Sequence, residues 1–386
     1  MLMSRTATPT AAQERAALVD AVRDFAETEL VPHAAQWDRD KFFPVDTLRT
    51  AGEMGLGGIY VREDVGGSAL SRRDAVAIFE ELAKGDTTIA AYISIHNMVA
   101  WMIDAFGDDA QRERWVPGLA EMSALGSYCL TEPGAGSDAA AITTSAVREG
   151  DEYAINGVKQ FISGAGSSAV YVVMVRTGEP GAKGISAIVV PDGTPGLSFG
   201  PNEEKMGWNA QPTRQVFFDD VRVPVSHRLG EEGDGFGIAM KGLNGGRVNI
   251  GACSLGGAQW SLERATRYVQ ERRAFGGPLA ENQSVVFALA DMETELQAAR
   301  ALLERAAEKM DEGAPDAAVA CALAKRFATD AASAAANAAL QLHGGYGYLK
   351  EYGIERVVRD LRVHQILEGT NEIMKMIIGR SLLESA

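Results

Sequence analysis

The sequence predicts a multidomain α+β fold in which a small β domain separates two helical domains. Apolar side chains recur at helical spacing from residue 11 to about 122, and again after about residue 233 in long, Ala-rich segments. Between these regions, short β-branched and aromatic runs are separated by Gly, Pro and Asn, as in a set of strands and turns. We therefore expect an N-terminal α-helical domain (1–123), a middle antiparallel, β-barrel-like domain (124–232) and a C-terminal four-helix-bundle domain (233–386).

The N-terminal helices are expected to surround one internal helix. The segment AAQERAALVDAVRDFAETELVPHA has an apolar side chain at roughly every third or fourth residue, which predicts an amphipathic helix. The segment TTIAAYISIHNMVAWMIDAFG is apolar on almost all sides, which is typical of a helix buried inside a protein. The first twenty residues contain no apolar signal-peptide segment, so we expect a cytoplasmic protein of bacterial type, or a mitochondrial-matrix protein if the source is eukaryotic.

Composition limits the kinds of ligand that we expect. The net charge is −15 and the sequence pI is about 4.9, which argues against a nucleic-acid surface and a basic membrane-binding surface. The three cysteines and five histidines show no metal-ligand spacing, and no window reaches about 18 uncharged apolar residues. We expect no metal site, no nucleic-acid partner and no membrane insertion. An anionic ligand would need a local cluster of Arg side chains and backbone N–H groups.

Two Gly-rich segments of the middle domain are candidate binding loops. YCLTEPGAGSD, starting at Tyr128, leaves a predicted strand, and its glycines would let backbone N–H groups approach an anion; a tight surface turn explains the same residues. Further along, Gly164, Gly166 and Ala169 match the GxGxxA pattern of dinucleotide-binding folds. That fold requires a helix after the loop, whereas AVYVVMVR is a predicted strand. We therefore reject the dinucleotide-binding interpretation of this loop.

Three further segments combine a ligand-binding interpretation with a structural one. Phe161 beside Ser163 would suit the edge of a flavin ring, although core packing explains a single Phe equally well. QLHGGYGY places two glycines just beyond a long helix, where they would end it. NGGR and ERRAFG contribute Arg247 and Arg272, and an isolated Arg is more often part of a surface ion pair than a ligand contact.

Glu368 is the candidate catalytic residue. In HQILEGTNEI it follows the apolar pair Ile366 and Leu367 and precedes Gly369. Considered alone, an acid at this position is explained by the favourable interaction of a carboxylate with a helix N-terminus. Considered as a base, it would be desolvated by Ile366 and Leu367, which raises the pKa of a carboxyl group.

Five segments, in one order and spacing, resemble the acyl-CoA dehydrogenase family: YCLTEPGAGSD, FISGAG, ERRAFG, QLHGGYGY and ILEGTNEI. The resemblance covers essentially the whole chain. It implies one FAD per subunit, a homotetramer, and oxidation of an acyl-CoA thioester to its trans-2-enoyl product, with electrons passed to an electron-transferring flavoprotein. Within the family, FISGAG, GWNAQPTRQVFFDDVRVPV and LNGGRVNIGACSLGGAQ most resemble the isobutyryl-CoA dehydrogenases, which form methacrylyl-CoA in valine catabolism.

The resemblance also implies roles for individual residues. Glu368 matches the family's catalytic base, which takes the α-proton while the N5 atom of the flavin accepts the β-hydride. The positions implied to bind FAD are Tyr128, Leu130, Thr131, Gly136, Ser137, Phe161, Ile162, Ser163, Thr370, Asn371 and Glu372. Those implied to reach the FAD of a neighbouring subunit are Arg272, Asn282, Gln283, Gln341, Leu342, His343, Gly344 and Gly345. Phe275, close to Arg272 in the sequence, is also implied to bind FAD. Those implied to contact the acyl-CoA are Ser137, Asn244, Gly245, Gly246, Arg247, Gly369 and Arg380.

The chain departs from some relatives at several of these positions. Phe161 stands where several relatives carry Trp, and Ser163 where they carry Thr, so ring stacking and a hydrogen bond to the flavin remain available. Glu372 replaces a Gln, and it can pair with Lys375 instead. Leu367 replaces the Tyr of some straight-chain relatives, which is compatible with a short, branched acyl group.

Several alternatives stay open. Other substrates within the family are 2-methylbutyryl-, isovaleryl- and butyryl-CoA. An acyl-CoA oxidase would pass electrons to O₂, but many oxidases carry an additional C-terminal domain that we do not expect in 386 residues. A third alternative is a non-catalytic flavin-binding assembly protein, against which the presence of Glu368 argues.

Overall fold

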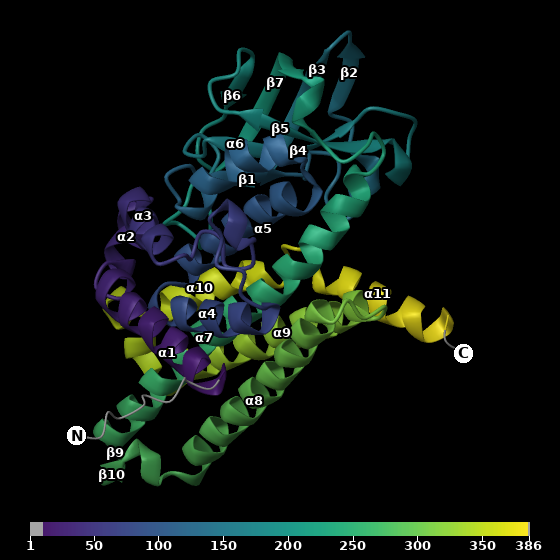
Figure 1. Ribbon diagram of the computed structural model, residues 1–386. Helices are drawn as coiled ribbons and strands as arrows, with labels where there is room; N and C mark the ends of the chain where they lie inside the picture. The colour runs from purple at the N-terminus through teal and green to yellow at the C-terminus, as the bar shows by residue number, and fades with distance from the viewer. Residues whose placement is uncertain (1–10, 385–386) are drawn as a thin grey trace, which may run out of the picture.

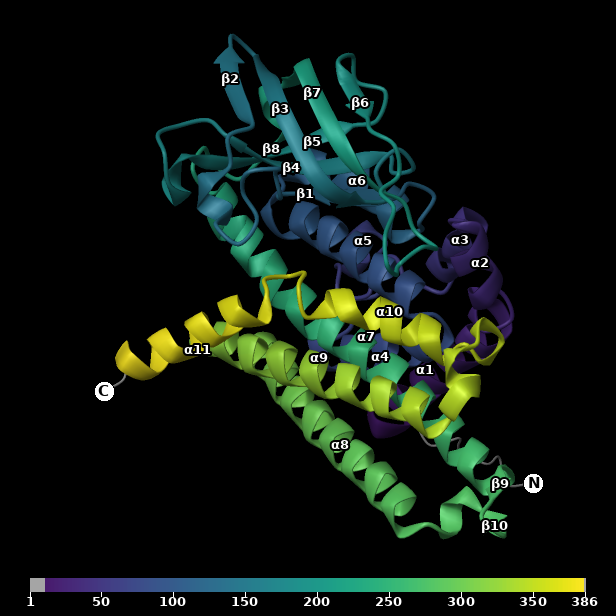
Figure 2. The ribbon, with the colours of Figure 1, turned by 180° about the vertical axis from the view of Figure 1, so that it is seen from behind.

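The computed structural model describes residues 11–384, which form a helical body with a β sheet at one end (Figures 1 and 2). Along the chain, helical segments come first, the strands of the sheet follow, and helices return to the end. The predicted fold class is therefore confirmed. The first ten residues, on which part of the expected localisation depends, lie outside the described range.

The N-terminal helices enclose one apolar helix, as predicted. Helix α5 is apolar and long enough to cross a membrane, but 78% of its apolar window is buried inside the protein. It packs against its neighbours α4 and α6 and against a later helix, α7 (Gly235–Glu271). The carboxylate of Asp86 caps its start by accepting a hydrogen bond from the N–H of Ile89. The helices of this region are α1 (Ala11–Phe25), α2 (Ala34–Asp40), α3 (Val45–Glu53), α4 (Arg72–Gly85), α5 (Thr87–Phe106) and α6 (Asp109–Ala120).

The sheet has the strand order β6-β7-β3-β2-β4-β5-β8, with β1 paired to β4. Most neighbours are antiparallel, as predicted, but β1 and β2 run parallel to β4. Long connections join β4 to these two strands, and such connections permit a parallel direction that a tight hairpin does not. The strands are β1 (Gly126–Cys129), β2 (Ser145–Glu149), β3 (Glu152–Ser163), β4 (Val170–Arg176), β5 (Ile185–Pro191), β6 (Leu197–Phe199), β7 (Thr213–Pro224) and β8 (Arg228–Leu229).

The GxGxxA segment forms a turn between strands. Gly164 and Gly166 both have positive φ, and the chain continues from this turn into β4. A strand therefore follows the loop, as the sequence predicts, and no dinucleotide-binding helix starts there.

The C-terminal helices form a bundle around α7. This helix runs from the sheet to the far end of the helical body, where the short β9–β10 hairpin lies (Figure 1). Helices α8 and α9 pack against it and against each other, and α4 packs against both α7 and α8. The elements are α7 (Gly235–Glu271), β9 (Arg273–Ala274), β10 (Gly277–Pro278), α8 (Gln283–Asp311), α9 (Ala317–Leu342), α10 (Ile354–His364) and α11 (Asn371–Glu384).

The close approach of α7 to α4 depends on Gly256. A Cβ atom at this position would lie 2.1 Å from the carbonyl oxygen of Glu80 and 2.9 Å from the Cβ of Ala83. We expect Gly256→Ala to lower the free energy of unfolding by about 1–3 kcal/mol, because the two helices have to move apart. The measurement is chemical denaturation of the purified protein.

Gly237, on the same helix, supplies the matched control. A Cβ atom there meets no described atom within 4 Å, so we expect Gly237→Ala to be neutral or to stabilise the protein by up to about 1 kcal/mol. Equal effects of the two substitutions would contradict the close-packing explanation.

Candidate active site

Glu368 lies in a sharp loop between α10 and α11. Its φ is 56° and that of Gly369 is 90°, so two consecutive residues have left-handed backbone conformations. This region is unfavourable for a residue with a side chain, and it persists in proteins where surrounding contacts hold it. Helix α11 then starts at Asn371, as the expected helix-start chemistry of this segment indicates.

One oxygen of the Glu368 carboxyl group is buried against α7. A Cβ atom on Gly246 would lie 2.5 Å from Oε2 of Glu368, so the carboxyl group packs directly on the helix at a residue without a side chain. That oxygen is buried and has no hydrogen-bond partner among residues 11–384. The Ile366 side chain, expected to help desolvate the group, is 51% exposed, so the close contact is supplied by α7.

Burial raises the pKa of Glu368 to about 7. Two cations nearby, Arg247 and Lys325, lower it again, but burial is the larger effect. Neither cation binds the carboxylate. The Nε–H of Arg247 donates to the backbone carbonyl of Glu368 over 3.0 Å, and its Nη1–H donates to Oδ1 of Asn244 over 2.7 Å.

Lys325 is a residue of the site that the sequence reasoning did not identify. It lies on α9, is fully buried, and donates hydrogen bonds to the carbonyl oxygen of Gly369 (2.9 Å) and to Oδ1 of Asn371 (2.8 Å). A lone Lys in an Ala-rich helix is expected to be solvated. The available signal is helical spacing, because Lys325 lies three or four residues from two buried positions, Cys321 and Ala328.

The Gly-rich loop after β1 is held from beneath by a buried ion pair. The ammonium group of Lys159 lies 2.8 Å from Oε1 of Glu132 and also donates to the carbonyl of Leu130 over 3.0 Å. The same carboxylate accepts hydrogen bonds from the backbone N–H groups of Thr143 and Thr144. The loop therefore has a fixed shape, and its glycines face outward.

The glycines of the Gly-rich loop after β1 face open space. Cβ atoms on Gly134 and Gly136 would meet no described atom within 4 Å, and Ser137 beside them is exposed. Tyr128, at the base of the loop, has a buried hydroxyl group for which residues 11–384 provide no hydrogen-bond partner. Thr131, in the same loop, is half-buried.

A bulge in β3 turns Phe161 outward. Phe161 has a φ of 59° and is 63% exposed, and the pairing of β3 with β7 shifts register between Lys159 and Ile162. Ile162 is buried in the core of the sheet. Oγ of Ser163 accepts a hydrogen bond of 3.2 Å from Nε2 of Gln211, a buried residue that we did not predict.

These groups fit the flavin part of an FAD. A flat aromatic ring at Phe161 is presented for stacking. Polar atoms at Tyr128 and Gln211 are buried and lack partners among the described residues, which is the arrangement expected where a polar ligand completes the site. At the start of α11, Thr370 is half-buried, Asn371 is buried and Glu372 is exposed.

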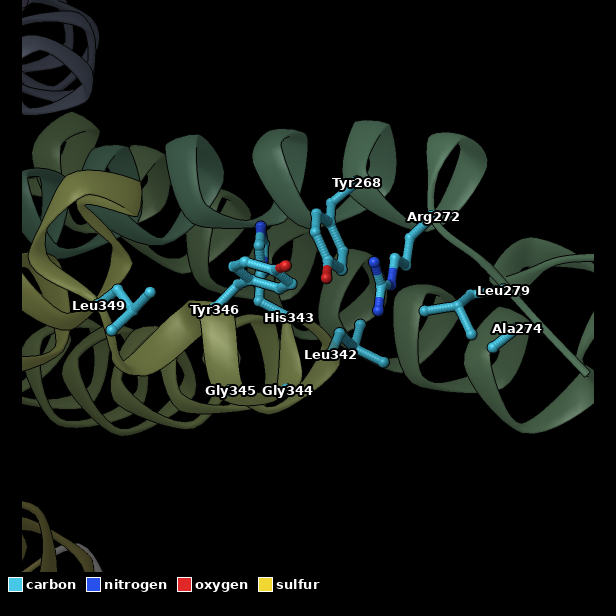
Figure 3. Close-up of a pocket in the computed structure, with 10 residues that line it drawn as sticks. All are labelled: Tyr268, Arg272, Ala274, Leu279, Leu342, His343, Gly344, Gly345, Tyr346 and Leu349. Atoms are coloured by element: carbon cyan, nitrogen blue, oxygen red, sulfur yellow. The ribbon is translucent and has the colours of Figure 1, made fainter.

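A second group of predicted cofactor residues lies at the opposite end of the helical body. Arg272 and the loop after α9 line a surface pocket of about 370 Å³, with the Arg272 side chain pointing toward Leu342 and Tyr346 (Figure 3). The neighbouring hairpin presents Phe275, which is 97% exposed. Within one chain, this group does not meet Glu368. It comprises Arg272, Phe275, Asn282, Gln283, Gln341, Leu342, His343, Gly344 and Gly345.

The predicted substrate residues are only partly brought together. Gly246, Arg247 and Gly369 surround Glu368, and Asn244 bonds to Arg247. Gly245 packs against the guanidinium group of Arg72. Arg380 is exposed on α11, roughly 14 Å along the helix from its start, so its contact with a substrate stays a prediction. Within the described part of the chain, no cluster of three His, Cys, Asp or Glu residues could hold a metal ion.

Comparisons with known proteins agree with this arrangement. Family descriptions for the acyl-CoA dehydrogenase N-terminal, middle and C-terminal domains match residues 12–123, 127–221 and 233–383. The chain is 56% identical over 361 residues to "Isobutyryl-CoA dehydrogenase, mitochondrial" of Bos taurus, covering 94% of this chain and 87% of the relative. It is 55% identical over 360 residues to the protein of the same name from Dictyostelium discoideum, covering 93% and 86%.

Among solved structures, butyryl-CoA dehydrogenase from Megasphaera elsdenii is similar with a TM-score of 0.94 and 38% identity, over 98% of this chain and 100% of that one. The similarity therefore extends over all three parts of the fold.

The raised pKa of Glu368 predicts a pH-dependent cost to stability. Below about pH 4.5, its ordinary pKa, the group is neutral in both the folded and unfolded states. Between there and about pH 7 the unfolded chain ionises first, so wild-type stability falls as the pH rises through this window. We expect Glu368→Gln to unfold with a free energy about 1–3 kcal/mol higher than wild type at pH 8, and to match it at pH 4.

Glu372→Gln is the control for this measurement. Glu372 is exposed in the same segment, and hydrogen bonds from its own backbone N–H and from Thr370 lower its pKa, so its removal should give no gain at pH 8. A gain of Glu368→Gln that is equal at pH 4 and pH 8 would contradict the burial of an ionisable group.

Proposed function

We propose that this chain, which belongs to the acyl-CoA dehydrogenase family and is an FAD-dependent oxidoreductase, oxidises isobutyryl-CoA to methacrylyl-CoA. In this reaction the α-carbon loses a proton, the β-carbon loses a hydride, and a carbon–carbon double bond forms between them. The observation that carries the proposal is the buried carboxyl oxygen of Glu368, which has no hydrogen-bond partner among the described residues. It lies against Gly246 of α7, one of the residues predicted to contact the acyl-CoA, and close to the start of α11.

Glu368 has the properties of a general base for the α-proton. Its Oε2 atom makes no hydrogen bond with residues 11–384, so its lone pairs can accept a proton from a substrate. With a pKa of about 7, the group is substantially ionised at neutral pH and is a stronger base than an ordinary carboxylate. Bound FAD supplies the acceptor for the β-hydride.

The residues near the Gly-rich loop are assigned to the flavin. We assign the exposed ring of Phe161 to stacking on the flavin, and the hydroxyl groups of Thr131 and Ser163 to hydrogen bonds with its edge. Support comes from the left-handed backbone at Phe161, which turns the ring outward, and from the open space above Gly134 and Gly136.

The distant group around Arg272 is assigned to the FAD of a neighbouring subunit. This pocket includes Arg272 and Ala274, beside the β9–β10 hairpin, and in one chain that hairpin lies at the other end of the bundle from the loop between α10 and α11 (Figure 2). Only a second copy could therefore bring the residues of this pocket to the same cofactor. A homotetramer is therefore part of the proposal. We also propose an electron-transferring flavoprotein as the electron acceptor and a cytoplasmic or mitochondrial-matrix location.

The choice of isobutyryl-CoA within the family rests on the relatives and on Leu367. Two relatives that share more than half of their aligned residues with this chain carry the name isobutyryl-CoA dehydrogenase. Leu367, the residue before the base, is partly buried against the hydrophobic core. An aliphatic side chain there leaves width for a branched acyl group.

Anaerobic titration of the FAD-loaded protein with acyl-CoA esters tests the substrate. We expect isobutyryl-CoA to bleach the flavin absorbance more efficiently than 2-methylbutyryl-, isovaleryl- or butyryl-CoA. Glu368→Gln is the control: it should retain yellow FAD, while bleaching slows by about 10²–10⁴-fold because the base is absent.

Each outcome of the titration decides a different part of the proposal. Equal or faster bleaching by another ester would overturn the choice of isobutyryl-CoA. Normal bleaching of Glu368→Gln would overturn the assignment of the base. Rapid reoxidation of the reduced protein by O₂ would favour an oxidase.

A further inference from the structure

We propose that Lys325 is a positioning residue for the base: it fixes the Glu368 loop through the Gly369 carbonyl and provides a buried positive charge that favours ionised Glu368. The inference rests on the proposed role of Glu368 and concerns a residue outside the motifs that define the site.

The geometry places Lys325 directly beneath the loop. Its side chain is fully buried, and its ammonium group lies 2.9 Å from the carbonyl oxygen of Gly369 and 2.8 Å from Oδ1 of Asn371. Asn371 in turn donates to Oγ1 of Thr329 and Oδ1 of Asp330 on α9. The start of α11 is thus tied to α9, against which it packs (Figure 2).

Two cations hold consecutive carbonyl groups of the strained loop. Arg247 donates to the carbonyl of Glu368, and Lys325 donates to the carbonyl of Gly369. These contacts compensate for the left-handed conformation of both residues. Because the cations bind the backbone, Oε2 of the carboxyl group has no hydrogen-bond partner in the described part of the chain, and it stays free to accept a proton.

The charges around the base make Lys325 an electrostatic partner of Glu368. Arg247 on α7 and Lys325 on α9 both favour the ionised carboxylate. Burial lowers the pKa of Lys325 to about 8, so the ammonium group is largely charged at neutral pH, and the charge of Glu368 opposes this lowering. The other titratable groups that act on this pair are Tyr60, Tyr128 on β1, Asp330 on α9, His364 on α10 and Glu372 on α11.

A purely structural role makes a different prediction. If Lys325 only satisfied two buried oxygen atoms, a neutral donor of similar length would replace it without changing the ionisation of Glu368. If its charge also acts on the base, every neutral substitution has to raise the pKa of Glu368, because an opposite charge nearby is lost.

The test compares Lys325→Met, Lys325→Gln and Lys325→Arg as FAD-loaded proteins. The first readout is the acid limb of the pH profile for flavin reduction by isobutyryl-CoA. We expect both neutral variants to move this limb up by about one pH unit or more, and Lys325→Arg to restore it toward wild type. Thr329→Ala is the matched control, because it removes a neutral hydrogen bond to the same Asn371 and should leave the limb in place.

The second readout needs no turnover. The stability gain of Glu368→Gln over its parent starts at the pKa of the unfolded chain and stops growing above the pKa of folded Glu368. We expect the pH at which the gain levels off to rise in the Lys325→Gln background. A failure of the substrate proposal would leave this readout intact, so the two failures can be told apart.

The electrostatic role would be overturned if the neutral variants left the acid limb unchanged and also left unchanged the pH at which the stability gain of Glu368→Gln levels off. Lys325→Gln serves if Lys325→Met does not fold, because it keeps a donor at the buried position. A shift produced equally by Thr329→Ala would also overturn it.

Discussion

The carboxyl group of Glu368 has to stay out of water without entering a salt bridge, and this constraint explains most of the residues around it. Gly246 lets α7 pack against the carboxyl group, because any side chain there would occupy its place. Arg247 and Lys325 direct their hydrogen bonds to the loop backbone. A direct ion pair would lower the pKa of the group and occupy its lone pairs, so the observed arrangement leaves the carboxyl group able to accept a proton near neutral pH, as the proposed role of a base requires.

The fold brings Glu368 and the Gly-rich loop, which lie far apart in the sequence, to the same site. Helix α7 runs from the sheet into the bundle, and thus connects the region of the Gly-rich loop with the turn that carries Glu368. On the sheet side, the buried pair of Lys159 and Glu132 fixes the Gly-rich loop, and the bulge in β3 turns Phe161 outward. Buried contacts therefore hold both the Gly-rich loop and the turn that carries Glu368 in place.

Periodicity in the sequence was sufficient to predict the order of helices and strands, and the internal position of α5. The motifs indicated Glu368 as an acid after an apolar pair, and Phe161 and Ser163 as an aromatic ring beside a hydroxyl group. The parallel pairing of β1 and β2 with β4 was not predictable, since it depends on how distant segments meet. Lys325 and Gln211 were missed for the same reason: their importance comes from the partners that the fold supplies, and neither lies in a recognisable pattern.

The most direct test of the account is the rate of flavin bleaching by isobutyryl-CoA that carries deuterium at its α-carbon, followed anaerobically in a stopped-flow instrument. If Glu368 removes this proton with a pKa of about 7, the rate should rise with pH through that value and should be lower for the deuterated substrate at every pH. A rate that shows no isotope effect at the α-carbon, and no change between about pH 5 and 9, would contradict the role of a buried carboxylate as the base.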